Sequence, residues 1–183
     1  IWDESKLNVT ELATSSFGQS FNVSMIQMAS AFCALVNGGN YYQPHLLSSI
    51  VDANGVTVKE NEPLVVRKTV SEATSEYLRE AFYQTVEAGT ASKAKVVGYL
   101  IGGKTGTSEK IDVFDENGQR VLDKIVSFVG IAPMDDPEYI VLVALNTPSR
   151  STGIYISGGV MAAPTVGAVM ADILPYLGVK QNY

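Results

Sequence analysis

The sequence predicts an α+β fold in which helices pack on an antiparallel sheet. A capped apolar segment at residues 25–37 is typical of a helix, and a second helical stripe begins at Pro164. Between them, three runs with strand-like composition occupy residues 99–109, 124–132 and 139–146. Linkers with turn-forming residues join these runs, so we expect an antiparallel meander.

The N-terminal part should begin as a loop and continue into a helix. Residues 1–16 are polar and mixed, which favours a loop. Ser24 and Gln27 have the spacing of a capping box, in which each side chain binds the other residue's backbone N–H. The helix should run to about Asn37, where the pair Gly38–Gly39 supplies a left-handed conformation that ends it. Because apolar residues surround nearly the whole helix, we expect it in the middle of a domain.

Short strands and a second helix should follow. Residues 46–70 read as short strands around a turn at Asp52–Gly55. Ser71 can cap a helix that runs to about Ala88 and stops at Gly89. This helix leads toward the first strand of the meander.

Two connections shape the expected meander. The linker at residues 112–123 is charged and contains Asn117-Gly118, which predicts a hairpin loop. Residues 134–137 form a Met-Asp-Asp-Pro sequence that is typical of a tight turn. The loop at residues 147–159 is rich in Gly and Ser, so we expect it to be mobile, and Pro164 then opens the last helix.

The last helix should be a core helix of the domain and not a membrane span. Residues 160–179 are apolar over nearly the length of a span. They contain Pro164, Asp172 and Pro175, which count against a span. The bulky residues fall on one helical stripe, which would face a core: Val166, Val169, Met170, Ile173, Leu174 and Leu177.

Composition narrows the classes of partner. The chain has 183 residues, 46% apolar and 17% charged, enough for one domain with a hydrophobic core. Its net charge of −6 comes without a basic stripe, which argues against nucleic acid and against docking on anionic lipid. Cys33 is the single cysteine, so no internal disulfide can form, and we expect a small core residue. His45 has no second His or Cys nearby, so we expect no metal and no cofactor.

The most informative segment is Lys104–Thr107, with the sequence Lys-Thr-Gly-Thr, at the end of an apolar run. Side chains alternate on a strand, so Lys104 and Gly106 share a face, and the glycine leaves room for a substrate. Lysine supplies charge for a carboxylate, Thr105 and Thr107 supply hydroxyl groups, and an edge strand can bind an extended peptide. The backbone N–H of Thr107 can stabilise an oxyanion. An ordinary surface strand beside a turn can carry the same four residues, so the Lys-Thr-Gly-Thr sequence alone does not establish a binding site.

Further landmarks surround this segment in order. They are Phe17-Gly18-Gln19, Val36–Gly39, Glu87–Thr90, Ser127–Pro133, Gly158-Gly159 and Ala162–Pro164. This series resembles the transpeptidase domain of class B penicillin-binding proteins, the D,D-transpeptidases that cross-link peptidoglycan in division or sporulation. The resemblance covers roughly residues 10–178, and the division-type and stage V sporulation protein D-type members look most similar.

The resemblance implies roles for residues of the strand. Lys104 would support a proton relay and anchor the substrate, while the hydroxyls of Thr105 and Thr107 would hold the carboxylate of the donor peptide or of a β-lactam. The backbone of Thr107 would complete the oxyanion hole and pair with the acyl side-chain amide. The implied catalytic residues are therefore Lys104 and Thr107. The implied substrate-binding residues are Gly103, Thr105, Gly106 and Ser108.

The chain departs from the family pattern at the nucleophile. The family places Ser-x-x-Lys and then Ser-x-Asn before the Phe-Gly-Gln landmark, and neither occurs in the sixteen residues before Phe17. Ser20-Phe21-Asn22 spells the second motif but follows the landmark, and Ser92–Lys95 spells the first but lies just before the Lys104 strand. We interpret neither as catalytic, because the nucleophile should open a buried helix with its lysine one turn along. We expect residues 1–183 to be the C-terminal portion of a single transpeptidase domain, inactive alone, whose nucleophile comes from the remainder of the domain or from a second polypeptide.

Two other functions stay open at this point. A penicillin-recognising sensor or scaffold would bind without turnover, and an upstream Ser-x-x-Lys in the full gene would favour the enzyme instead. A serine β-lactamase is the third option, against which the Phe-Gly-Gln and Ala-Ala-Pro landmarks speak. The resemblance further implies a place on the extracytoplasmic face of a bacterial membrane, anchored by an N-terminal helix. The implied partners are peptidoglycan stem peptides, β-lactam antibiotics and cell-division or spore-cortex proteins, and no nucleic acid.

Overall fold

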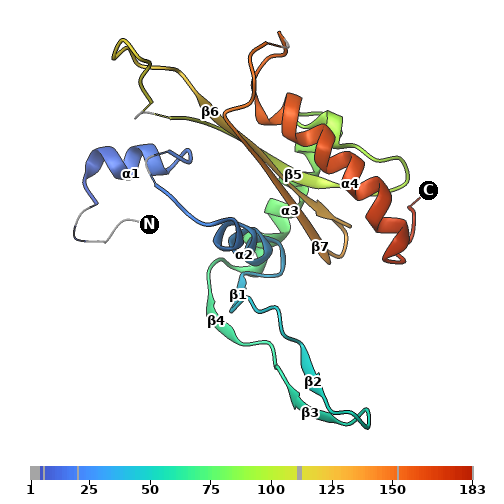
Figure 1. Ribbon diagram of the computed structural model, residues 1–183. Helices are drawn as coiled ribbons and strands as arrows, with labels where there is room; N and C mark the ends of the chain where they lie inside the picture. Colours follow the sequence, from blue (N-terminus) through green and yellow to red (C-terminus); the bar gives the residue numbers. More distant parts are fainter. Residues whose placement is uncertain (1–4, 6, 20, 111–112, 152, 183) are drawn as a thin grey trace. The chain divides into compact units, whose positions relative to one another are not determined.

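The computed structural model describes residues 5, 7–19, 21–110, 113–151 and 153–182 (Figure 1). The chain divides into two compact units, one formed by residues 1–23 and 79–183 and the other by residues 24–78.

The first unit is built on the predicted three-stranded meander. Strands β5 (Gly102–Glu109), β6 (Lys124–Ala132) and β7 (Tyr139–Asn146) form an antiparallel sheet in that order (Figure 1). The bounds of β6 and β7 match the sequence prediction, and β5 begins three residues later than expected. The hairpin between β5 and β6 is confirmed by a bridge between Phe114 and Arg120. Residue 112, where the predicted loop begins, lies outside the described residues.

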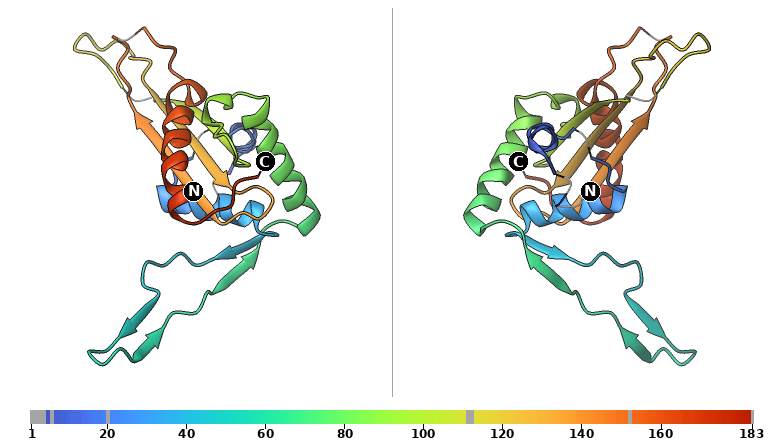
Figure 2. Two further views of the ribbon diagram at one scale, coloured as in Figure 1. Left: turned by 90° about the vertical axis from the view of Figure 1, so that its right-hand side faces the viewer. Right: turned by 90° about the vertical axis from the view of Figure 1, so that its left-hand side faces the viewer.

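One helix covers the sheet of this unit. A five-residue π-helical turn (Gly158–Ala162) leads into α4 (Ala163–Tyr176), which packs on β6 and β7 (Figure 2). Val166, Met170 and Leu174 of the predicted stripe have no exposed surface, whereas Val169 and Leu177, which were expected on the same stripe, are exposed. The segment Gly158–Tyr176 has the length and hydropathy of a membrane span, and 39% of its apolar window is buried inside the protein. This packing supports the prediction of a core helix.

A short helix near the N-terminus was not predicted. Helix α1 (Val9–Ser15) begins after Asn8, whose Oδ1 accepts the backbone N–H groups of Thr10 at 2.8 Å and Glu11 at 3.2 Å. The expectation of a loop through residue 16 was therefore wrong. None of the side chains of α1 is buried, so the sequence carries no apolar period that would reveal a helix here.

The second unit opens with the predicted capped helix α2 (Met25–Val36). The capping box is confirmed: Ser24 Oγ accepts the N–H of Gln27 at 3.3 Å, and Gln27 Oε1 accepts the N–H of Ser24 at 2.9 Å. Gly38 ends the helix with a φ of 83°. Only Ala34 and Val36 of α2 are buried. Most of the apolar side chains of α2 are therefore not buried by the described residues, so its expected place in the middle of a domain stays a prediction.

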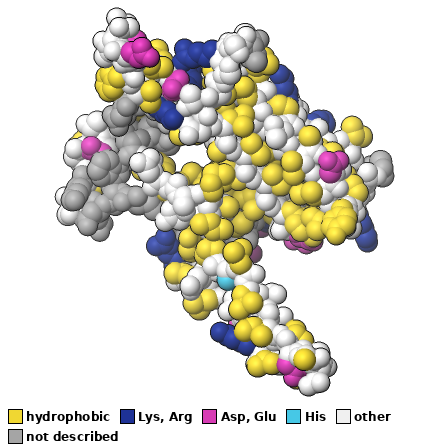
Figure 3. All heavy atoms as spheres, viewed as in Figure 1, with side chains coloured by type: hydrophobic (Ala, Val, Ile, Leu, Met, Phe, Trp, Pro, Cys, Tyr) yellow, Lys and Arg dark blue, Asp and Glu magenta, His cyan; other side chains and the backbone are white. Residues whose placement is uncertain are grey.

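After α2 this unit contains an arm of paired strands and the first part of the next helix. Strand β1 (Asn40–Tyr42) pairs with β4 (Val65–Lys68), and β2 (Ser49–Val51) pairs with β3 (Thr57–Glu60), all antiparallel. Strand β1 was not foreseen. Apolar side chains lie exposed along the arm (Figure 3), among them Ile50, Val51, Val56, Val58, Val65 and Val66.

The arm turns at the predicted Asp52–Gly55 position. Asp52 Oδ1 accepts the backbone N–H of Val56 at 2.9 Å and that of Asn54 at 2.8 Å. These two hydrogen bonds, that of Val56 above all, lower the pKa of the Asp52 carboxyl below its ordinary value. The turn is therefore held by an ionised side chain as well as by backbone geometry.

The second predicted helix is α3 (Glu72–Glu87), and Ser71 caps it by accepting the N–H of Thr74 at 3.1 Å. Phe82 and Val86 lie on its predicted apolar stripe and are buried. A short 3₁₀ helix, η2 (Ser92–Ala94), links α3 to β5 and contacts α4.

Candidate active site

The Lys-Thr-Gly-Thr segment lies on β5, at the edge of the described sheet. The N–H of Lys110 donates to Asp123 O at 2.8 Å, in register with the pairing of Gly106 with Ser127. Hydrogen-bonded pairs alternate along an antiparallel ladder. The backbone groups of Lys104, Gly106 and Ser108 therefore point toward β6, and those of Thr105 and Thr107 point outward from the sheet.

Two side chains occupy this outward edge. Lys104 Nζ donates to Thr105 O at 2.9 Å, so the exposed ammonium group lies beside the edge carbonyl. Gln19 Nε2 donates to Thr107 O at 3.4 Å, and Gln19 Oε1 accepts from Ser108 Oγ at 3.5 Å. The backbone groups that an extended peptide would bind are thus held by flexible side chains.

The two threonines lie on the opposite face of β5 from Lys104. Gly103 pairs with Gly130, and a side chain at Gly130 would touch Val166 and Met170 of α4. Odd-numbered residues of β5 therefore face α4, whereas Lys104 and Gly106 face the other side, as predicted. The ammonium group of Lys104 reaches the backbone carbonyl of Thr105 at the outward edge, whereas the two hydroxyls have their contacts on the α4 side of the strand.

The threonine hydroxyls have partners from other parts of the chain. Thr105 Oγ1 lies 3.4 Å from Thr90 Oγ1, just beyond the end of α3. Thr107 Oγ1 accepts the backbone N–H of Gly158 at 3.3 Å, at the start of the π-helical turn. The sequence had marked Thr90 and Gly158 only as landmarks, and Gln19 likewise. Their order along the sequence relative to β5 was the signal that could have found them, and the structure brings all three residues into contact with this strand.

The glycines of the strand allow close packing on both sides. A Cβ atom at Gly103 would lie 2.1 Å from Val129 O and 2.6 Å from Phe128 Cζ. A Cβ atom at Gly106 would lie 2.5 Å from Ser127 Oγ on the Lys104 side. Gly103 thus allows close packing on the α4 side, and Gly106 allows the Ser127 hydroxyl to approach the strand on the Lys104 side.

These residues belong to a known domain. The family model of the penicillin-binding protein transpeptidase domain matches residues 3–171. The chain belongs to this transpeptidase family. Within the family it is a class B member, and the α+β fold expected from the sequence is confirmed.

Relatives of this transpeptidase domain include division and sporulation proteins. The chain is 41% identical over 177 residues to stage V sporulation protein D of Bacillus subtilis, covering 96% of this chain and 26% of that protein. It is 34% identical over 195 residues to a probable peptidoglycan D,D-transpeptidase FtsI of Caulobacter vibrioides, covering 99% and 30% respectively. The chain therefore spans between a quarter and a third of these relatives.

Solved structures of the family agree with the fold. Penicillin-binding protein 3 from Mycobacterium tuberculosis in complex with aztreonam gives a TM-score of 0.81 at 25% identity, covering 100% of this chain and 42% of that one. The transpeptidase domain of penicillin-binding protein 3 from Burkholderia pseudomallei gives 0.75 at 28% identity, covering 98% and 50%.

The Ser-x-x-Lys sequence at Ser92–Lys95 does not resemble a transpeptidase nucleophile in its geometry. Ser92 opens a 3₁₀ helix of three residues, too short to place a lysine one α-helical turn along. The ammonium group of Lys95 forms an ion pair with Glu87 instead. The other rejected motif begins at Ser20, which lies outside the described residues.

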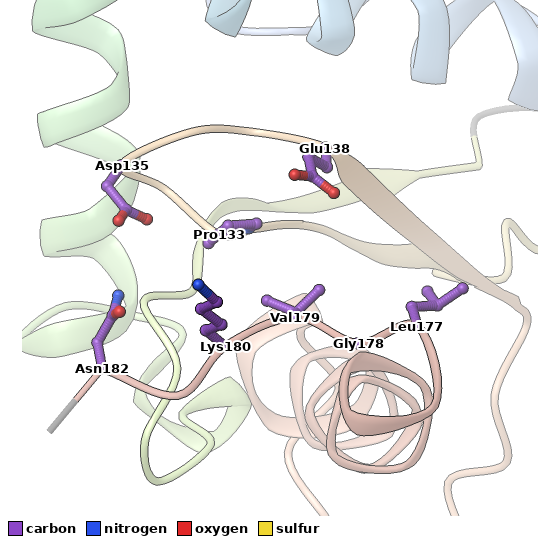
Figure 4. A pocket seen from close by; sticks show the side chains of 8 residues that line it. All are labelled: Pro133, Asp135, Glu138, Leu177, Gly178, Val179, Lys180 and Asn182. Carbon is purple, nitrogen blue, oxygen red and sulfur yellow. The ribbon is translucent and has the colours of Figure 1, made fainter.

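A cavity of about 350 Å³ lies elsewhere in this transpeptidase unit, between the β6–β7 turn and the C-terminal tail (Figure 4). Its lining residues are Pro133, Asp135, Glu138, Leu177, Gly178, Val179, Lys180 and Asn182. None of the residues Gly103–Ser108 lines it, so it is separate from the predicted site. Among the described residues, no group of three or more His, Cys, Asp or Glu side chains gathers as a metal site.

Proposed function

We propose that this chain is part of a peptidoglycan D,D-transpeptidase that cross-links stem peptides through a serine acyl-enzyme and is acylated by β-lactams. The observation that carries the proposal is the outward edge of β5, where the Lys104 ammonium donates to the backbone carbonyl of Thr105 and the backbone groups of Thr105 and Thr107 point outward.

The edge suits an extended peptide that ends in a carboxylate. The ammonium of Lys104 and the two hydroxyls can form charge-assisted hydrogen bonds to a carboxylate. The carbonyl of Thr107 can accept the amide N–H of an acyl chain laid along the strand. The outward N–H of the same residue can stabilise the oxyanion of a tetrahedral intermediate. Lys104 and Thr107 thus fill the catalytic roles, with Gly103, Thr105, Gly106 and Ser108 shaping the substrate site.

The nucleophile belongs to the rest of the protein in this proposal. The chain contains no Ser-x-x-Lys in a position that resembles the family's, and the relatives are three to four times longer. One relative is named a probable D,D-transpeptidase, and related penicillin-binding protein 3 structures hold aztreonam and ampicillin. We extend the same substrates and inhibitors to the whole protein. The whole protein would be anchored by an N-terminal membrane helix, with this domain on the extracytoplasmic face of a bacterial membrane. Its protein partners would be division or spore-cortex proteins.

The test is acylation by benzylpenicillin of the protein encoded by the complete reading frame, followed by denaturing intact-mass spectrometry. Lys104→Ala should slow acylation about 10- to 100-fold, since a hydrogen bond to a charged group contributes about 1.5–3 kcal/mol. The melting temperature should hardly change, because Lys104 is exposed and makes one hydrogen bond to the backbone.

Lys93→Ala is the matched control, because Lys93 is an exposed lysine outside the strand. A Lys104→Ala protein that acylates at the wild-type rate would contradict the role of Lys104. A wild-type protein that gains no mass would favour the sensor or scaffold instead. An adduct located on Ser20 or Ser92 would show that the nucleophile had been misplaced.

A further inference from the structure

Two groups outside the predicted site contact its hydroxyls. They are the backbone N–H of Gly158 and the side chain of Thr90, which come from the π-helical turn and from the segment after α3. The strand motif alone gives neither of them a role. Together with Gly159 they form a support that lies against the α4 side of β5.

Gly158 reaches Thr107 only because it has no side chain. A Cβ atom at this position would lie 2.2 Å from Ser127 O and 2.7 Å from Gly106 O, both backbone atoms that cannot move aside. The glycine is buried, and its N–H donates to Thr107 Oγ1 at 3.3 Å. The close approach of two backbones thus places a fixed donor on a site hydroxyl.

Gly159 holds Thr90 in the same way. A Cβ atom at Gly159 would lie 2.1 Å from Thr90 O and 3.6 Å from Thr105 Cγ2, so this buried glycine fits between the two threonines. The hydroxyl of Thr90 then lies 3.4 Å from that of Thr105. The Gly158-Gly159 pair therefore positions both groups that contact the site hydroxyls: the N–H of Gly158 beside Thr107, and the side chain of Thr90 beside Thr105.

The hydrogen-bonding partner of each site hydroxyl decides where its proton can point. A threonine hydroxyl has one proton to donate and two lone pairs. A backbone N–H can only donate, so Thr107 Oγ1 accepts from Gly158 and its proton is directed elsewhere. Either hydroxyl can donate in the 3.4 Å contact between Thr90 and Thr105, and when Thr90 donates, the proton of Thr105 is also available to a ligand. Such a set of donors favours an anionic acceptor over a neutral group.

We propose that Gly158 and Thr90 are positioning residues that orient the hydroxyls of Thr107 and Thr105 as donors and thereby select a carboxylate over its neutral amide. The proposal rests on the proposed function for the identity of the site. It concerns a step before any acylation, since selection of the carboxylate occurs when the ligand binds.

The experiment compares the binding of N-acetyl-D-alanine and N-acetyl-D-alaninamide to the complete protein. Methyl NMR signals of Thr105 and Thr107 report the affinity of each ligand. Thr90→Val removes the hydroxyl and keeps the shape, and it should reduce the preference for the acid about 3- to 10-fold. Thr90→Ser keeps a hydroxyl and should retain the preference within about twofold. Affinity for the amide should be unchanged in both variants.

Gly158→Ala should abolish the preference if the protein folds, and because it risks misfolding, Thr90→Val is the deciding variant. Equal loss of acid and amide binding in Thr90→Val would mean a merely structural role and overturn the proposal. So would an unchanged preference, or a wild-type protein that does not prefer the acid. Because this readout needs no nucleophile, a protein that selects the acid but is never acylated would refute the proposed function and leave the positioning role standing.

Discussion

Phe128 should be the side chain on which the site strand depends most. It lies on β6 directly opposite Thr105, and its ring has no exposed surface. The ring fills the space left by two glycines: a Cβ atom at Gly103 would lie 2.6 Å from Phe128 Cζ, and one at Gly130 would lie 3.3 Å from Cε1. Phe128→Ala would therefore remove the support beneath Lys-Thr-Gly-Thr and leave a cavity that the glycines cannot fill.

The expected loss is about 3–5 kcal/mol, the usual range for Phe→Ala in a close-packed core. A domain of this size loses about 2–4 °C of melting temperature per kcal/mol, so the transition should fall by about 6–20 °C. The measurement is thermal unfolding of the complete protein, followed by circular dichroism. Phe114→Ala is the matched control, because Phe114 is 60% exposed in the hairpin after β5 and should cost less than about 0.5 kcal/mol.

Similar melting temperatures for the two variants would refute the reasoning. They would mean that the ring is not packed between β5 and α4 as described, or that the strand relaxes to close the cavity. Phe128→Leu separates these cases, since it keeps most of the apolar volume and should cost less than Phe128→Ala only if the site is closely packed.

Three further outcomes are expected. Carboxyl NMR should give a lower pKa for Asp52 in the folded protein than in a urea-unfolded peptide of residues 48–61. The stability that the Asp52 carboxylate contributes to the turn is present at pH values above the pKa of the unfolded state. It is lost as the pH falls through the pKa of the folded state. Burial raises the pKa of the Cys33 thiol, so it should react with iodoacetamide more slowly in the folded than in the unfolded protein at pH 8, and equal rates would contradict this. Gln19→Ala frees the carbonyl of Thr107 and should speed acylation by benzylpenicillin about two- to fivefold, whereas slower acylation would mean that Gln19 helps to bind the ligand.

Much of the fold could be predicted because its signals are local. The capping box of α2 needs only Ser24 and Gln27, which are three residues apart, and the structure has both of its hydrogen bonds. The bounds of β6 and β7 follow from composition and from the turns that flank them. Helix α1 was missed because its side chains are exposed and leave no apolar period, and β1 was missed because a strand of three residues is too short to show one.

The sequence by itself determined the helices α2, α3 and α4, the three-stranded meander, the family resemblance and the strand that carries Lys104. Only the tertiary structure decided that Gln19, Thr90 and Gly158 touch this strand, and that the Lys104 ammonium reaches the backbone carbonyl of Thr105 at its outward edge. The physical reason is separation along the chain. Gln19 lies 89 residues from its partner Ser108, and Gly158 lies 51 residues from Thr107. Periodicity and capping extend over a few residues, whereas these contacts exist only once the sheet, the π-helical turn and the end of α3 have packed together.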